Sequence, residues 1–165
     1  MLPRRHPRPA LGSGVDAAAR QRPVFLPSHL RAEWDAVCRG HHNFLLVGTP
    51  PATNRMLAAM TPHLDEPLQR YSPKAGLPLP QPSEGTLILL EVARLDAKQQ
   101  YELLRWLDEF DQRSHVQVIS TTSKPLFSLV ERGAFLGELY YKLNVVRIDL
   151  IGLGNADRPA RLPLD

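Results

Sequence analysis

Four short segments that predict strands constrain what this chain can fold into more than any other feature. They lie at residues 44–47, 86–90, 116–120 and 145–150, and the first two are nearly continuous apolar runs. Runs of this length are typical of strands that are buried on both faces of a parallel sheet. Segments with helical spacing separate the runs, which is the pattern of β-α-β units. The sequence therefore predicts an α/β fold, a three-layer sandwich with a mostly parallel sheet.

The segments between these runs predict the helices. We expect helices from the N-cap Ser28 to Gly40, around residues 56–60, from 96 to 110, from the N-cap Ser123 through Val130, and from 138 to 143. Five prolines interrupt residues 65–85, so we expect a surface loop there with room for one edge strand.

The length of 165 residues corresponds to one domain, which we place at residues 25–150. Residues 1–24 are rich in arginine and proline and predict a disordered tail, and residues 151–165 predict a loosely ordered one. Residues 1–22 hold five arginines and one aspartate, a net charge of +4 in a chain whose total is +3. Contact with nucleic acid is therefore expected only through this tail.

Composition excludes several function classes. No apolar run approaches the roughly 20 residues of a membrane span, so no contact with a membrane is expected. The single cysteine, Cys38, excludes an internal disulfide and a multi-cysteine zinc site. The adjacent His41 and His42 have no acidic or cysteine partner at ligand spacing, so no metal site is expected. No apolar segment follows the N-terminal arginines, which argues against a secretory signal.

Three separated segments carry a family resemblance. Residues 85–92 read Gly-Thr-Leu-Ile-Leu-Leu-Glu-Val, residues 116–123 read Val-Gln-Val-Ile-Ser-Thr-Thr-Ser, and residues 133–146 contain Leu-Tyr-Tyr-Lys-Leu-Asn-Val. In order and spacing they resemble the Walker B strand, the sensor I strand and the arginine-finger helix of the bacterial sigma-54-dependent transcription activators, a branch of the AAA+ superfamily. The resemblance covers residues 85–150 and extends weakly back to about residue 28. It implies a P-loop NTPase core of the AAA+ type in a cytoplasmic bacterial protein, and we expect the family's lid domain to be absent.

One further likeness is misplaced. Residues 133–138 match four of the six letters of the Gly-Ala-Phe-Thr-Gly-Ala loop with which the family contacts its sigma factor. That loop lies between Walker A and Walker B in the family, whereas this stretch follows the sensor I strand. We therefore do not expect this chain to remodel a sigma factor by the family's means.

The resemblance places the P-loop at residues 48–55, which read Gly-Thr-Pro-Pro-Ala-Thr-Asn-Arg. Gly48 matches the first glycine of the motif, but Thr53 stands at the second glycine, Asn54 at the lysine and Arg55 at the next residue. A P-loop holds phosphate with converging backbone N–H groups and a lysine. The two prolines have no N–H, so two possible donors are missing.

The other catalytic positions are also substituted. The Walker B aspartate falls on Leu90, while Glu91 is retained at the position that would orient the attacking water; without a metal it could pair with Arg94 or with solvent. The sensor I asparagine falls on Ser123, and the two finger positions fall on Leu136 and Lys142. ATP hydrolysis by the family mechanism is not expected from this set, and Glu91 is the one catalytic candidate.

Three functional hypotheses follow. The first is a non-catalytic AAA+-like regulatory module that binds a protein partner, either an activator-type ATPase or a second copy of itself, and needs no cofactor. The second is an unorthodox binder of Mg-ATP that uses the candidate site residues Gly48, Thr53, Asn54, Arg55 and Ser123, with Arg55 as the cation. The third is contact with nucleic acid through residues 1–22.

Overall fold

The computed structural model describes residues 22–39, 42–73, 79, 84–110 and 115–152. The tails expected at residues 1–24 and 151–165 lie almost wholly outside these residues, as does His41, so those expectations stay predictions. No helix in the described ranges is long and apolar enough to cross a membrane.

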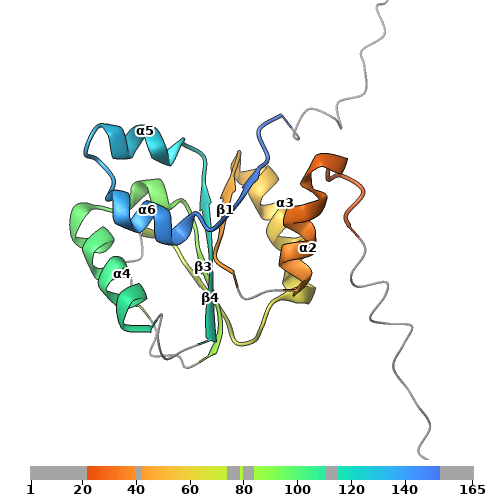
Figure 1. Cartoon of the computed structure of the whole chain (residues 1–165), viewed down its shortest axis with the longest axis horizontal. Helices are drawn as coiled ribbons and strands as arrows, with labels where there is room; N and C mark the ends of the chain where they lie inside the picture. The colour runs from red at the N-terminus through yellow and green to blue at the C-terminus, as the bar shows by residue number, and fades with distance from the viewer. Residues whose placement is uncertain (1–21, 40–41, 74–78, 80–83, 111–114, 153–165) are drawn as a thin grey trace, which may run out of the picture.

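Five parallel strands form one sheet in the order β2-β3-β4-β1-β5 (Figure 1). Their bounds are β1 (Phe44–Val47), β2 (Leu68–Tyr71), β3 (Glu84–Leu89), β4 (His115–Thr122) and β5 (Val146–Asp149). The inner strand β1 is buried along its whole length and pairs with both neighbours, so that Leu46 lies opposite Thr121 on one side and Ile148 on the other. The parallel sheet that the apolar runs predict is confirmed.

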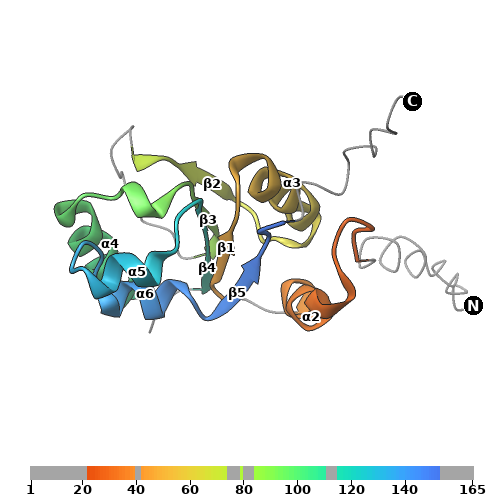
Figure 2. The ribbon, with the colours of Figure 1, turned by 90° about the horizontal axis from the view of Figure 1, so that it is seen from above.

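Helices cover both faces of the sheet (Figure 2). They are η1 (Ser28–Leu30), α2 (Arg31–Arg39), α3 (Pro50–Met60), η2 (Thr61–His63), η4 (Val92–Arg94), α4 (Ala97–Phe110), α5 (Leu126–Glu131) and α6 (Gly137–Leu143). Side chains of α2 and α3 pack on one face, where Phe44 and Leu46 point, and those of α4, α5 and α6 pack on the other, where Leu45 and Val47 point. The predicted three-layer sandwich is therefore confirmed.

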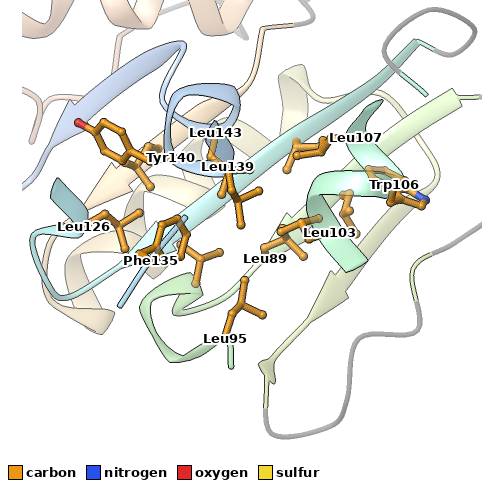
Figure 3. Packing of buried hydrophobic residues seen from close by; sticks show 14 of the residues in the cluster. Leu89, Leu95, Leu103, Trp106, Leu107, Leu126, Phe135, Leu139, Tyr140 and Leu143 are labelled. Carbon is orange, nitrogen blue, oxygen red and sulfur yellow. The ribbon is translucent and has the colours of Figure 1, made fainter. Parts of the chain in front are cut away.

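The core under α4 and α6 is the larger of the two clusters. Leu103, Trp106 and Leu107 of α4 face Leu139 and Leu143 of α6 across the sheet surface (Figure 3). Each of these five side chains is buried because the apolar stripe of its helix faces the sheet. Burial of apolar surface on this scale is the main stabilising contribution to the fold.

Three local predictions need correction, and one is confirmed. The helix expected around residues 56–60 begins at Pro50, directly after a two-residue turn, because proline is well accommodated in a first helical turn. Ser28 is not an N-cap, since Pro27 holds that position for η1 and no side chain caps it. Ser123 does not cap α5 either, because the cap is Pro125 and the Ser123 hydroxyl is bonded elsewhere. The edge strand that the 65–85 segment had room for is β2.

Candidate functional site

Three predicted site residues follow three neighbouring strands at the same edge of the sheet. Gly48 comes directly after β1, Glu91 two residues after β3, and Ser123 directly after β4. In open parallel sheets, ligands bind at the carboxyl ends of the strands, at the topological switch point where two neighbouring strands connect to helices on opposite faces. Here β1 and β4 are neighbours, and the helix after β1 lies on one face while the helices after β4 lie on the other. The three residues lie at this switch point.

The turn between β1 and α3 is short. Only Gly48 and Thr49 separate the strand from the helix, so residues 50–55 form the first helical turns. Pro50 and Pro51 hold the first two helical positions, and the Thr53 amide already donates to the Thr49 carbonyl. A helix leaves open the amides of its N-cap and of its first three residues, here Thr49, Pro50, Pro51 and Ala52. The two prolines have no N–H, so only Thr49 and Ala52 can donate. A phosphate cradle uses several converging N–H groups at this point.

Gly48 has a structural use that is independent of any ligand. A Cβ at this position would lie 2.9 Å from the Leu150 Cβ, closer than side-chain carbons approach. The Gly48 amide donates to the Thr122 carbonyl, and the Leu150 amide donates to the Val47 carbonyl, so the strand pairing continues past the end of β1 on both sides. The glycine lets β5 pass close to this turn.

The remaining candidates on α3 do not converge. Thr53 is buried, and its hydroxyl donates to the Pro50 carbonyl at 3.1 Å. Asn54, at the position of the family's lysine, is exposed. The Arg55 guanidinium lies 5.7 Å from the centre of the Phe25 ring, a cation–π contact with the segment that precedes η1.

Glu91 and Ser123 come into direct contact, which neither segment of sequence indicates by itself. The Ser123 hydroxyl donates to Glu91 Oε2 at 2.8 Å, and the Ser123 amide donates to the same oxygen at 3.3 Å. The Glu91 amide donates to the Thr121 hydroxyl, which ties the end of β3 to the end of β4 a second time. Glu91 is therefore paired with Ser123, and the interpretation that it pairs with Arg94 is wrong.

The geometry of Glu91 is unusual in two further ways. Its backbone has φ 54°, a left-handed conformation that costs a residue with a Cβ about 1–2 kcal/mol. Its second oxygen, Oε1, is buried and has no hydrogen-bond partner among the described residues. Leu90, at the position of the Walker B aspartate, has no acidic group to offer a metal, and the described residues contain no cluster of His, Cys, Asp and Glu that could hold one.

The two arginine-finger positions have structural contacts within the chain. Leu136 is the N-cap of α6, and its amide donates to Gln100 Oε1 at 2.8 Å. Lys142 pairs with Asp108 of α4, with its Nζ 2.8 Å from Oδ1. The motifs of the sequence give no role to Gln100 or Asp108. Gln100 is a polar residue on the apolar face of α4. A polar residue at such a position indicates a buried hydrogen-bonding role, and this feature of the sequence could have identified Gln100.

Comparisons with known proteins agree with this fold. A model of the family described as Sigma-54 interaction domain matches residues 27–153. The HTH-type transcriptional regulatory protein TyrR of Enterobacter agglomerans is 35% identical over 79 residues, 42% of this chain and 15% of TyrR. The transcriptional regulatory protein GlrR of Escherichia coli K12 is 37% identical over 89 residues, 48% and 20% of the two chains. The Nif-specific regulatory protein of Azotobacter vinelandii is 36% identical over 92 residues, which are 50% of this chain and 17% of that protein. The matched parts thus span a fifth or less of these relatives.

Solved structures give the same architecture. NtrX from Brucella abortus, in complex with ADP, superposes with a TM-score of 0.63 at 21% identity, over 83% of this chain and 38% of NtrX. The P-loop NTPase domain of the sigma-54 transport activator from E. coli superposes with a TM-score of 0.54 at 22% identity, over 73% and 91% of the two chains. At such identities the likeness shows the fold alone, a P-loop NTPase-like α/β core.

The family match extends over most of the described residues, well beyond the 85–150 segment that carried the resemblance, and so confirms it. The relatives are bacterial regulators of transcription. The chain therefore belongs to the sigma-54 interaction domain family and is related to the sigma-54-dependent transcription activators.

Proposed function

We propose that this chain is a non-catalytic, AAA+-like regulatory module of the bacterial cytoplasm that acts through protein–protein contacts. The observation that carries the proposal is the start of α3, where Pro50 and Pro51 replace two of the amides that would face a phosphate. With only the N–H groups of Thr49 and Ala52 left at this helix start, the turn cannot surround a phosphate as a P-loop does.

The metal side of the site supports the same conclusion. A P-loop ATPase holds Mg²⁺ with a P-loop hydroxyl and the Walker B aspartate. Here Arg55 stands at the position of that hydroxyl, and Leu90 has no ligand atom in its side chain. Glu91 is engaged by Ser123, so the retained carboxylate braces two strand ends rather than facing an open site.

Exposed aromatic side chains on α5 and α6 support a role in protein contacts. Phe127 and Tyr141 are both exposed, and the ring centroids of both lie within 6.0 Å of the Tyr140 ring. Both exposed rings therefore pack on the same buried Tyr140 side chain, and aromatic side chains are enriched at interaction sites. The expected partner is an activator-type ATPase or a second copy of this chain.

The second candidate function is nucleotide binding without hydrolysis. It is favoured by the fold, since solved structures of NtrX are in complex with ADP and with ATP. In this alternative Arg55 supplies the cation for the phosphates in place of the lysine. To contact the phosphates, the Arg55 side chain would have to leave its cation–π contact with Phe25.

A thermal-shift titration with Mg-ATP and Mg-ADP separates the two functions. A ligand at a hundred times its Kd stabilises the folded state by about 2.7 kcal/mol, which raises the melting temperature measurably. We expect no shift for the unchanged chain or for Arg55→Ala. A shift that Arg55→Ala abolishes would establish the nucleotide binder and overturn the non-catalytic module at its central site.

The partner is tested by mixing. The purified chain is added to a full-length activator-type ATPase from the same bacterium, and the ATPase rate and the size of the complex are measured. We expect the chain alone to show no turnover and to change the rate of the activator, or to form a defined complex with itself. Turnover by the chain alone, or a monomer that leaves the activator's rate unchanged, contradicts the proposal.

A further inference from the structure

A hollow of about 280 Å³ lies beside the start of α2, apart from the strand-to-helix turn. Its lining residues are Arg22, Ser28, Arg31, Trp34 and Asp35. None of them belongs to residues 48–55 or to the Glu91–Ser123 pair, so the hollow is separate from the site of the ATPase motif. It places two guanidinium groups and one hydroxyl around the same space, with a tryptophan as one wall.

The guanidinium of Arg22 has an unsatisfied donor. Its Nη1 atom is buried and has no hydrogen-bond partner among the described residues. A buried, unpaired donor of a charged group is costly, and a negative charge bound beside the same guanidinium offsets part of that cost. Ser28 and Arg31 are exposed at the rim of the same hollow, so their donors are available to that negative group.

The charges of the hollow favour an anion. Asp35 is the one acidic residue of the lining, and its Oδ2 lies 3.7 Å from Nη2 of Arg39, a neighbour outside the hollow. Arg39 therefore offsets part of the negative charge of Asp35. Arg22 and Arg31 then leave the space positive.

We propose that this hollow binds the phosphate group of a small phosphorylated molecule. Two guanidinium forks and a hydroxyl present more donors than the two oxygens of a carboxylate can accept, and they match a tetrahedral phosphate. The volume is at the lower end of the roughly 300–1,000 Å³ that small-molecule sites occupy. It therefore fits a phosphate with a small attached group. The inference goes beyond the proposed function, because it needs neither the family's site nor a protein partner.

The test is a calorimetric titration of the full chain with inorganic phosphate and with pyrophosphate, at constant ionic strength with chloride as the reference anion. We expect saturable binding, and we expect Arg31→Gln and Arg22→Gln each to weaken it at least about tenfold, since each removes a charge-assisted donor. Arg70→Gln is the matched control, because Arg70 is exposed on β2 and makes the same change of charge outside the hollow. Its affinity should stay within about twofold of the unchanged chain.

A second readout locates the ligand. In NMR spectra of the ¹⁵N-labelled chain, phosphate should shift the indole N–H signal of Trp34, which lines the hollow, and leave that of Trp106 unchanged. Trp106 packs on the opposite face of the sheet and is the internal control. Absence of saturable binding, equal affinity of all variants, or equal shifts of both indoles would overturn the proposal. Arg31 is exposed, so Arg31→Gln keeps the test decisive even if Arg22→Gln fails to fold.

Discussion

Gly48 and Glu91 match the ATPase motif of the family, and each also has a structural use in this fold. Gly48 gives β5 the space to pass, and Glu91 joins the ends of β3 and β4 through Ser123 and Thr121. A residue that matches a catalytic motif can therefore be needed for packing alone. The two uses are distinguishable, because a structural use predicts a change in the free energy of unfolding without any ligand.

Gly48→Ala should lower the free energy of unfolding by about 1–3 kcal/mol, the usual cost of forcing an extra carbon into a packed site. The added Cβ would meet the Leu150 Cβ at 2.9 Å. Urea denaturation measures the change. Gly137→Ala is the control, since its Cβ would lie at an ordinary 3.5 Å from Val130 Cγ1 and its position begins α6. Equal stability of Gly48→Ala and the unchanged chain would show that the turn adjusts and that packing does not require the glycine.

The Glu91–Ser123 contact is best measured with a double-mutant cycle. Glu91→Ala and Ser123→Ala should each destabilise the fold, with a coupling energy of about 1 kcal/mol, as expected for a charge-assisted hydrogen bond that is partly exposed. The control is a second double-mutant cycle, which combines Glu91→Ala with Ser128→Ala on α5. Its coupling energy should be close to zero. Additive effects of Glu91→Ala and Ser123→Ala would mean that the contact contributes nothing to stability.

The sequence placed Glu91 and Ser123 among the candidates separately, and their contact could not be predicted from it. The contact depends on the register of β3 against β4, in which Leu89 lies opposite Ser120. Register is determined by the packing of whole strands and not by the residues near the site. The same limit applies to Arg55, whose contact with Phe25 joins α3 to a segment thirty residues earlier.

Among the elements, the buried strands could be predicted from the sequence, whereas the first and last residues of the half-buried elements could not. The strands β1, β3 and β4 are covered on both faces. The sequence of β1 and the end of β3 are therefore continuous apolar runs, whereas β4 also buries polar residues: Gln117, Ser120, Thr121 and Thr122. The edge strand β2 is half-buried, and its residues Leu68–Tyr71 have no such pattern. The start of α3 was missed because Pro50 and Pro51 usually indicate a loop, although the first helical positions also accept them.

Gln100 is the residue that holds α4 to the loop before α6. It is buried, its Nε2 donates to the carbonyls of Leu95 and Ala134, and its Oε1 accepts from the Leu136 amide. Gln100→Leu fills the same space without these bonds and should lower the free energy of unfolding by about 2 kcal/mol. Hydrogen exchange should show the Leu136 amide less protected than in the unchanged chain.

Glu102→Gln is the control for Gln100→Leu, because Glu102 is exposed on the same helix. It should leave the unfolding free energy and the Leu136 exchange rate almost unchanged. If Gln100→Leu is as stable as this control, the three hydrogen bonds of Gln100 are replaced by others and the loop does not depend on them.

At the scale of the whole molecule, one sheet serves two cores. The inner strands β1, β3 and β4 direct alternate side chains into the cluster under α2 and α3 and into the cluster under α4, α5 and α6. Neither set of helices can keep its apolar stripe buried if the sheet separates. We therefore expect both cores to unfold in one cooperative transition, as single domains of this size usually do.

Ile148→Val tests this cooperativity with a small change at one edge of the sheet. Ile148 is fully buried in β5 and contributes to the core under α2 and α3, so the variant should lose about 0.5–1.5 kcal/mol. The indole signals of Trp34 and Trp106 report the two cores separately in a urea titration followed by NMR. Both midpoints should fall by the same amount. The control is Val145→Ala, at an exposed residue beside β5, which should change neither midpoint.

A midpoint that falls for Trp34 alone would show that the two faces of the sheet unfold independently. In that case the helices α4, α5 and α6, with the exposed aromatic side chains of α5 and α6, would stay folded after the packing on the other face is lost.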